Sequence, residues 1–380
     1  MSKRDILISG AGIGGASAAI ALRRRGHDVI VFERSPQPRE VGAGITLWPN
    51  ALAALDRVGL AEPIRAAGRS IDFAEVRTED GRRLFEADLR PLWRRFLRPG
   101  IGIHRGELLR ILVEAVPEES LRTDSEVTGF DATAEGVIIF LASGEEIEGT
   151  ALVGADGLHS TVRKQLHPDG LLRASRSVAW RGVVSGFKDA FGSDRTCAVL
   201  GRGLQAGVVP IGSDRHYWFI CFTVSRSLEV LGDEASALFE ERVKALWSPL
   251  REMIAASEPP HVAELFDREP IRSWGSGRVT LLGDAAHPTT PNLGQGACQA
   301  LEDAVVLAET YRPEDVAASL RAYESRRFAK TTRIVRESRR MGRILQLENT
   351  LTRRLRDLAI RFLPTRWQTD RQSWMFETDF

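Results

Sequence analysis

The stretch DILISGAGIGG, residues 5–15, sets the fold, because an apolar run ends there in the glycine pattern G-x-G-x-x-G. An alanine-rich segment follows to about Arg25, and a second apolar run at residues 29–32 ends in Glu33. This order predicts a strand, a tight turn, a helix and a second strand. Glycines at such a turn let the backbone approach a pyrophosphate, and the terminal acid can accept hydrogen bonds from ribose hydroxyls. The stretch therefore predicts a dinucleotide site and leaves FAD and NAD(P) both open.

The composition is that of an ordinary globular protein. A chain of 380 residues suggests about two to three domains, and its 43% hydrophobic and 27% charged residues are near the usual averages. The 52 Lys+Arg and 51 Asp+Glu nearly cancel, so no net field would attract nucleic acid. The three cysteines lie far apart without metal-ligand spacing. We therefore expect a reducing compartment, no metal site and no nucleic-acid partner.

The N-terminus also has a feature of secretory signals. Residues 6–22 carry no charge and follow Lys3 and Arg4. The glycines in this run would weaken a signal helix, and residues 29–32 continue the same predicted fold. No stretch offers the ~20 apolar residues that span a bilayer. We therefore expect a cytoplasmic protein without integral membrane association.

Two later motifs repeat the pattern of an apolar strand that ends in an acid. The first is GADGLHSTVR at residues 154–163, with Asp156. The second is GDAAHPTTPNLGQG at residues 283–296, with Asp284 and a glycine-rich turn before a predicted helix. Asp284 can bind sugar-like hydroxyls, and the amides at the start of that helix can stabilise negative charge. The motifs predict a second polar-ligand site.

Together with the loop GAGITLWPN at residues 42–50, these motifs resemble the single-component, class A FAD-dependent aromatic monooxygenases with the para-hydroxybenzoate hydroxylase fold. The urate hydroxylase and alkylquinolone hydroxylase branches are the most similar. The resemblance covers nearly the whole chain. It implies an α/β fold, in which a Rossmann-like FAD-binding domain carries an inserted, mostly antiparallel β-sheet substrate domain and a C-terminal helical segment.

The predicted domains are discontinuous. We assign residues 1–70, 100–172 and 272–340 to the FAD-binding domain, 71–99 and 173–271 to the substrate domain, and 341–380 to the C-terminal segment. The strands expected in the substrate sheet are residues 71–78, 177–187, 204–211, 217–224 and 262–267, and residues 234–256 should form a helix that covers it.

Motif chemistry and resemblance together predict bound FAD, with NAD(P)H as co-substrate. The residues expected to bind FAD are Gly10, Gly12, Ile13, Gly14, Gly15, Glu33, Arg34, Gly44, Thr46, Arg105, Val127, Asp156, Asp284, Gly294, Gln295, Gly296 and Ala297. Cys298 is a departure, since the family often has asparagine there. A thiol is a poorer hydrogen-bond donor, so flavin positioning should rely more on backbone amides.

The resemblance implies that NAD(P)H reduces the flavin and that O2 then forms a C4a-hydroperoxide, which hydroxylates an electron-rich aromatic or heteroaromatic small molecule. The expected catalytic residues are Tyr217 and Pro291, and the expected substrate-binding residues are Gln205, Arg202, Arg181 and Trp48. Gln205 stands where the urate branch has an arginine, which argues against urate.

Several alternatives stay open from the sequence alone. Tyr217 and Trp48, like Trp180, could be plain core residues, Arg181 could form a surface pair, and His287 fits a structural role better than that of a base. The same fold could also perform epoxidation, Baeyer–Villiger insertion or dehydrogenation. A non-enzymatic prenyl-binding escort protein fits the intact motifs poorly. A homodimer is left open.

The C-terminal segment contains an amphipathic helical pattern. Its apolar positions are Leu351, Leu355, Leu358, Ala359 and Phe362, and arginines surround them. Such a helix could lie on a membrane. We expect instead that it docks on its own domain through the apolar face and leaves the arginines in solvent.

Overall fold

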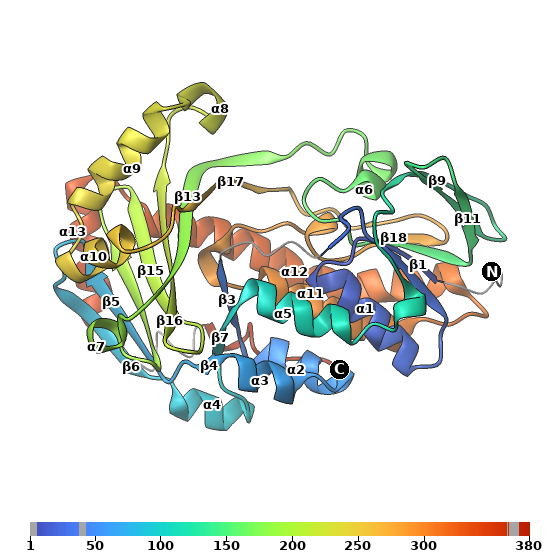
Figure 1. Ribbon diagram of the computed structural model, residues 1–380, viewed down its shortest axis with the longest axis horizontal. Helices are drawn as coiled ribbons and strands as arrows, with labels where there is room; N and C mark the ends of the chain where they lie inside the picture. Colours follow the sequence, from blue (N-terminus) through green and yellow to red (C-terminus); the bar gives the residue numbers. More distant parts are fainter. Residues whose placement is uncertain (1–5, 38–42, 363, 365–371) are drawn as a thin grey trace.

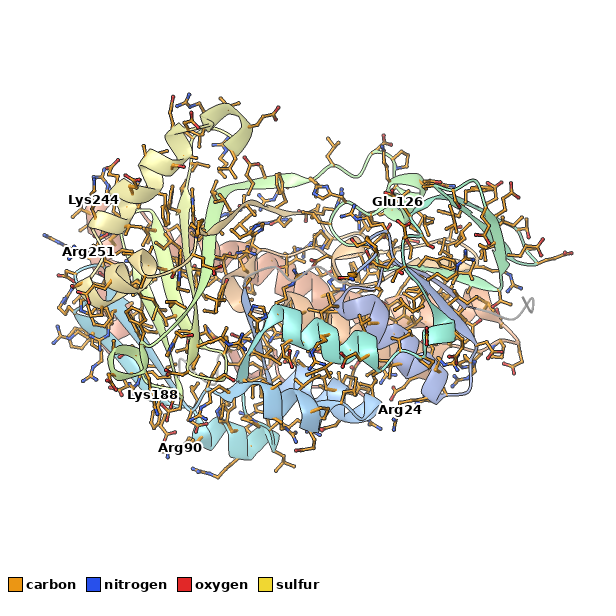
Figure 2. All side chains as sticks on the ribbon, viewed as in Figure 1. Arg24, Arg90, Glu126, Lys188, Lys244 and Arg251 are labelled. Atoms are coloured by element: carbon orange, nitrogen blue, oxygen red, sulfur yellow. The ribbon has the colours of Figure 1, made fainter. Side chains whose placement is uncertain are left out.

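The computed structural model describes residues 6–37, 43–362, 364 and 372–380. Figure 1 shows two parts side by side, one with a parallel sheet and several helices and the other with a larger sheet. Charged side chains such as Arg24, Lys188 and Lys244 lie exposed at the periphery (Figure 2). No helix among the described residues is both long and apolar enough to cross a bilayer.

The first part is organised by a five-stranded sheet in the order β18–β12–β1–β2–β8, whose neighbours all pair in parallel. Its strands are β1 (Ile6–Ser9), β2 (Val29–Phe32), β8 (Leu121–Arg122), β12 (Ala151–Gly154) and β18 (Val279–Leu281). Every residue of β1 and β12 is buried. Because successive side chains point to opposite faces, both faces of the sheet must be covered, as is usual for parallel sheets.

Helices and two small sheets complete this part. The helices are α1 (Ile13–Arg24), α2 (Pro49–Val58), α3 (Ala61–Ala67), α5 (Arg105–Glu114), α6 (Thr161–Leu166), α11 (Gly296–Thr310) and α12 (Val316–Leu345). One small sheet contains β9 (Val127–Ala132), β10 (Val137–Leu141) and β11 (Glu146–Gly149), and the other contains β3 (Gly44–Leu47), β4 (Arg69–Ser70) and β7 (Ile101–His104). Short 3-10 turns are η1 (Glu118–Ser120), η2 (Gly283–Ala285) and η3 (Pro291–Leu293).

The second part is built on a seven-stranded sheet in the order β17–β13–β16–β15–β14–β5–β6. Its strands are β5 (Phe73–Thr78), β6 (Arg83–Asp88), β13 (Arg173–Ser185), β14 (Arg195–Leu200), β15 (Leu204–Pro210), β16 (Arg215–Thr223) and β17 (His261–Asp267). Only the β14–β5 pair is parallel among these neighbours. The predicted mostly antiparallel sheet is therefore confirmed. The sequence-based expectation missed β6 and β14.

Helices cover the outer face of this sheet (Figure 1). They are α8 (Leu228–Leu231), α9 (Glu234–Lys244) and α10 (Ser248–Ala255), while α4 (Arg90–Phe96) and α7 (Lys188–Phe191) lie lower in the view. The single helix predicted over residues 234–256 is thus wrong. The chain breaks at Trp247, whose backbone N–H donates to the Glu79 carbonyl (2.7 Å) instead of continuing α9. Pro249 then starts the next helix in its first turn, where proline is tolerated.

The C-terminal helix α13 (Thr350–Phe362) exposes the apolar face that was expected to be buried. Arg356 is buried and bonds to Asp357 and the Leu345 carbonyl, and Arg353 pairs with Glu79 at 2.5 Å. Leu351 is 67% exposed and Phe362 is 72% exposed. The expectation of a docked apolar face with solvated arginines is therefore wrong, because the apolar positions are exposed while Arg356 is buried and Arg353 is partly buried against Glu79.

Candidate active site

Two glycines of the turn after β1, Gly10 and Gly15, leave no space for a side chain. Gly10 has φ +98°, and a side chain there would meet the Ala155 carbonyl. A Cβ on Gly15 would lie 1.9 Å from the Gly10 carbonyl oxygen, so helix α1 can approach β1 only without one. Gly12 differs, because nothing lies within 4 Å of its Cβ position. The backbone is thus closely packed at Gly10 and Gly15 and open at Gly12, where a pyrophosphate could approach.

Glu33 lies beside this turn, at the carboxyl end of β2. One carboxylate oxygen accepts a hydrogen bond from the Ala11 N–H (2.9 Å) and the other from the Ser35 N–H (2.9 Å). The Glu33 carbonyl accepts from the Ser125 N–H (2.8 Å), which brings the chain just before Val127 to the same place. Val127 itself is buried in β9, and Arg34 is exposed. Backbone amides therefore fix the acid that the sequence assigned to ribose.

Asp156 is held by the start of α6. Its Oδ2 accepts from the N–H groups of Thr161 (2.8 Å) and Val162 (3.3 Å). Burial raises the pKa of Asp156, and the hydrogen bonds around it oppose this shift. Its Oδ1 is buried without a hydrogen-bond partner among the described residues. A buried carboxylate oxygen without a partner is costly, so this atom fits a site that receives a donor from a ligand.

Asp284 occupies the third glycine motif. Its side chain is exposed, although surrounding protein raises its pKa. Electrostatic interactions with His287 and with Arg105 of α5 oppose the shift. No described residue donates a hydrogen bond to Asp284. Its oxygens are therefore free for ligand hydroxyls.

Arg163 joins the second and third motifs. It is buried, and its Nη1 donates to the carbonyl oxygens of Ala285 and Ala286, both at 2.8 Å. Because β1, β12 and β18 are parallel neighbours, the three motifs follow the carboxyl ends of adjacent strands. This is the edge at which α/β sheets bind ligands. The sequence reasoning gave Arg163 no role, and only the fold reveals one.

A buried polar network supports the turn that follows Asp284. His287 Nε2 lies 2.6 Å from Asp303 Oδ2, and Arg327 Nε donates to Asp303 Oδ1 (2.7 Å). Burial alone would raise the pKa of Asp303, but electrostatic interactions and hydrogen bonds with His287 and Arg327 outweigh burial and lower the pKa to about 2. Arg327 also donates to Glu302 (2.7 Å). His287 thus bonds to a buried partner. The sequence reasoning missed Arg327 and both acids.

The glycine-rich turn before α11 is tied to two other loops. Gln295 accepts a hydrogen bond from Asn50 Nδ2 (3.0 Å) at the start of α2. The Cys298 thiol approaches the carbonyl oxygens of Thr46 (3.8 Å) and Gly294 (3.5 Å), and burial raises its pKa to about 12. No side chain caps the N-terminus of α11. Its first amides, including those of Gly296 and Ala297, therefore have no capping side chain to compete with a ligand.

A cavity of about 140 Å3 lies between these loops and the seven-stranded sheet. From the loops it is lined by Gly44, Ile45, Thr46, Pro291, Asn292 and Gly294, and from the sheet by Ala179, Arg181, Gln205, Val209, Tyr217, Phe219 and Cys221. Four of the six residues expected to be catalytic or substrate-binding thus meet in one place. Asn292 was missed, although it belongs to the third motif.

Strand alternation explains which side chains reach the cavity. On β16, Tyr217 and Cys221 face it, while Trp218 on the other face is fully buried in the core under the outer helices. Trp180 also packs in that core, stacked on Phe222 with ring centroids 4.6 Å apart. It therefore does not line the cavity.

Two expected substrate residues do not reach the cavity. Arg202 is exposed, and its backbone contacts Glu79 and Arg242. Trp48 packs against Trp93 and Phe376, with ring centroids 6.1 and 5.6 Å away. Its Nε1 is buried without a partner among the described residues, next to Gly294. Trp48 thus borders the glycine-rich turn before α11 rather than the cavity.

The cavity contains few ionisable groups. Burial raises the pKa of Tyr217 to about 12, with Arg181 opposing the shift, and burial likewise raises the pKa of Cys221 to about 12. Among the described lining residues, Arg181 alone is charged near neutral pH, and no carboxylate or histidine is present. The cavity can therefore stabilise a substrate anion and donate hydrogen bonds, but it has no obvious general base. No cluster of described side chains could hold a metal ion.

Comparison with known proteins agrees with this geometry. A family described as "FAD binding domain" matches residues 3–338. The aurachin C monooxygenase/isomerase of Stigmatella aurantiaca is 37% identical, covering 94% of each chain. The 3-hydroxybenzoate 6-hydroxylase 1 of Aquipseudomonas alcaligenes is 36% identical, covering 88% of each chain. The crystal structure of Klebsiella pneumoniae HpxO complexed with FAD and uric acid aligns at TM-score 0.89 and 28% identity, covering 98% of this chain and 96% of that one. The chain therefore belongs to the FAD-binding-domain family of class A flavin hydroxylases and is an FAD-dependent aromatic monooxygenase that uses NAD(P)H.

Proposed function

We propose that this enzyme uses O2 to hydroxylate an electron-rich aromatic or heteroaromatic ring held in the cavity beside Tyr217. The observation that carries the proposal is the cavity itself, which lies between two loops, residues 44–46 and 291–294, here called the flavin loops, and the seven-stranded sheet. Its volume of about 140 Å3 is close to that of an engineered cavity of about 150 Å3 that takes benzene. One aromatic ring therefore fits, and a second ring or a substituent would extend past Asn292.

The described residues fit bound FAD. Glu33 would bind the adenosine ribose, the open side of Gly12 and the start of α1 would receive the pyrophosphate, and Asp284 would bind ribityl hydroxyls. Uncapped amides at the start of α11 would stabilise negative charge on the ring system. When bound, FAD supplies the redox chemistry and the oxygen activation. The predicted domain division remains part of this proposal.

The residues of the cavity would orient the substrate. Arg181 would stabilise a phenolate or another anionic group on the ring, which increases electron density at the carbon that is hydroxylated. Tyr217, neutral because its pKa is about 12, would donate a hydrogen bond. Gln205 accepts from Asn292 Nδ2 (3.1 Å) and keeps its own amide N–H groups for substrate. A neutral amide at this position still argues against urate itself.

The test is a purified protein with a flavin spectrum. It should be yellow, and an aromatic substrate should stimulate NAD(P)H oxidation in a screen of phenols, hydroxybenzoates and quinolones. Isotopically labelled O2 should place one labelled atom in a ring hydroxyl. Label in an epoxide or an ester would instead support one of the alternative oxygenations, and an unlabelled oxidised product would indicate dehydrogenation.

A matched pair of variants tests the residue assignment. Arg181→Gln should raise KM for a substrate that binds as an anion by roughly tenfold or more, the scale of a lost charge-assisted hydrogen bond. Arg202→Gln makes the same charge change outside the cavity and should leave KM unchanged. Equal effects of the two substitutions would contradict the proposed role of Arg181.

A further inference from the structure

A second cavity, of about 360 Å3, adjoins the substrate cavity. It lies where the beginning of β13, the end of β17 and the last turns of α12 meet, and Asn292 lines both cavities. Four arginines line it, namely Arg173, Arg176, Arg339 and Arg343. Only two carboxylates, Asp267 and Glu348, line it among the described residues. The wall of this arginine cavity therefore carries net positive charge.

Two of the arginines are already paired. Arg173 contacts Asp267 through two bonds (2.8 and 3.0 Å), and Arg339 does so through two more (both 3.1 Å). Asp267 is fully buried, and the two guanidinium groups lower its pKa although burial would raise it. This cluster holds the wall in place. One carboxylate shared by two guanidinium groups leaves the cluster with net positive charge.

Arg176 and Arg343 are different. Both are exposed, and neither forms an ion pair with another described residue. Ser175, next to Arg176, lines the same cavity, and its Oγ is buried without a hydrogen-bond partner among the described residues. Two unpaired guanidinium groups and a free hydroxyl around one space are the donor set that an anion requires.

The partition between the two cavities is polar but neutral. Asn292 bonds to Gln205 (3.1 Å), and Gln346 Nε2 donates to the Cys221 sulfur (2.9 Å). Gln346 Oε1 in turn accepts from Ser177 (2.8 Å). These side chains belong to both cavities or bridge them. A molecule whose ring lay beside Tyr217 and that extended past Asn292 toward the arginines would therefore meet no carboxylate in the partition.

We propose that the arginine cavity binds a carboxylate or phosphate group of a molecule that reaches the substrate cavity past Asn292. The inference rests on the proposed function, because that function places the ring. Two molecules in the reaction can carry such a group. The aromatic substrate can carry it as an acidic substituent, and the reduced nicotinamide coenzyme carries it as its phosphates. Arg176 and Arg343 are the residues that would bind it.

The first experiment uses the FAD-loaded protein and inorganic pyrophosphate as the probe. Binding is measured by the shift in melting temperature and by flavin fluorescence. The double variant Arg176→Gln/Arg343→Gln should bind pyrophosphate roughly ten- to a hundredfold more weakly than the wild type. Arg354→Gln/Arg361→Gln on α13 is the matched control, since it removes two exposed arginines elsewhere and should bind like the wild type.

The second experiment identifies the source of the anion. Anaerobic flavin reduction gives Kd for NADH and NADPH, and the flavin absorbance change gives Kd for 3-hydroxybenzoate and for phenol. Weaker coenzyme binding in the Arg176/Arg343 variant assigns the site to coenzyme phosphate. Weaker binding of 3-hydroxybenzoate than of phenol, relative to the wild type, assigns it to a substrate carboxylate. Either result supports the proposal.

The proposal is overturned if the Arg176/Arg343 variant matches the wild type within twofold for pyrophosphate, both coenzymes and 3-hydroxybenzoate. It is also overturned if the α13 control loses binding to the same extent, because net charge alone would then explain the loss. Failure of the proposed function looks different. The flavin would then not be reduced by either coenzyme in the wild type, whatever the result with pyrophosphate.

Discussion

Tyr217 and Arg181 reach the substrate cavity from neighbouring antiparallel strands, β16 and β13. Arg181 is directly opposite Phe219, two residues along the strand from Tyr217, so the phenol and the guanidinium are diagonal neighbours. Burial keeps the phenol neutral, while Arg181 stays charged. The two side chains therefore have different roles. Tyr217 would donate a hydrogen bond as a neutral phenol, and Arg181 would stabilise negative charge on the substrate.

The first prediction concerns Tyr217. Because its pKa is raised from 10.0 to about 12, it remains protonated throughout an assay from about pH 6 to 10. Tyr217→Phe should lower kcat/KM roughly tenfold through the lost hydrogen bond. The shape of the pH profile and the flavin spectrum should not change. A basic limb near pH 10 in the wild type that disappears in the variant would contradict this role, because Tyr217 would then titrate as a base.

The second prediction separates two glycines of the same turn. Gly15→Ala places a Cβ 1.9 Å from a carbonyl oxygen, so the protein should lose about 1–3 kcal/mol of unfolding free energy even without FAD. Gly12→Ala meets no protein atom within 4 Å and should cost the apoprotein under about 1 kcal/mol. It should nevertheless weaken FAD binding, because the methyl group occupies the open side of the turn. Denaturant unfolding and FAD titration of both variants give the measurement, and equal destabilisation of the two apoproteins would refute the distinction.

At the scale of elements, α11 and α12 are joined by charges rather than by apolar contacts alone. Glu302 and Asp303 of α11 face Arg327 of α12, and all three are nearly or fully buried. Lys330 adds a contact to Glu302 (2.8 Å). Removing one member of such a cluster leaves the others buried and uncompensated. The network therefore fixes how the two helices support the turn that contains Asp284.

The third prediction follows from this network. Arg327→Met should lower the free energy of unfolding by about 3–5 kcal/mol. Arg326→Gln, one residue earlier, removes partly exposed pairs with Glu309 and Asp379 and should cost under about 1 kcal/mol. Urea unfolding of the FAD-loaded proteins makes the comparison. Similar losses of unfolding free energy for the two variants would show that the buried network stabilises the protein no more than an exposed ion pair does.

The acid dependence of this network has a defined sign. The pKa of Asp303 is lowered to about 2 in the folded protein and is about 3.9 in an unfolded chain. Its contribution is therefore complete above about pH 4 and is lost as the pH falls through about 2. Asp303→Asn should remove this part of the acid dependence. An unchanged dependence in the variant would assign acid unfolding to other groups.

The elements also show what the sequence can and cannot reveal. The glycine turns and their acids were predictable, because their geometry depends on a few adjacent residues. The exposure of Leu351 on α13 was not predictable, because it depends on the ion pair between Arg353 and Glu79, which are distant in sequence. Arg202 and Gln205 are close in the chain, yet only Gln205 lines the cavity, because Gln205 lies on β15 whereas Arg202 lies in the turn between β14 and β15. The short strand β6 was also not predictable, because its few apolar residues are interspersed with charged ones and give only a weak strand pattern.

At the scale of the whole molecule, the two parts pack closely against each other at the edge of the substrate cavity. A side chain on Gly44 of β3 would lie 2.4 Å from the Cβ of Tyr217, and one on Gly102 of β7 would lie 2.1 Å from the Pro210 carbonyl oxygen. The small sheet that carries a flavin loop therefore fits directly against the substrate sheet. Substrate cavity and flavin loops are thereby fixed relative to each other, as an oxygen transfer over a short distance requires.

The last prediction concerns FAD as part of this architecture. The proposed FAD ligands come from residues 10–15, 33, 44–46, 284 and 294–297, so only the folded chain brings them together, and FAD should bind the folded state alone. FAD at about 100 times its Kd should then stabilise the protein by about 2.7 kcal/mol. Stripped protein titrated with FAD should show a melting temperature that rises with concentration, and Gly12→Ala should need more FAD for the same rise. A melting temperature that does not respond to FAD in protein that regains its yellow colour would mean that the coenzyme binds the unfolded chain equally well, and the three motifs would then not form one site.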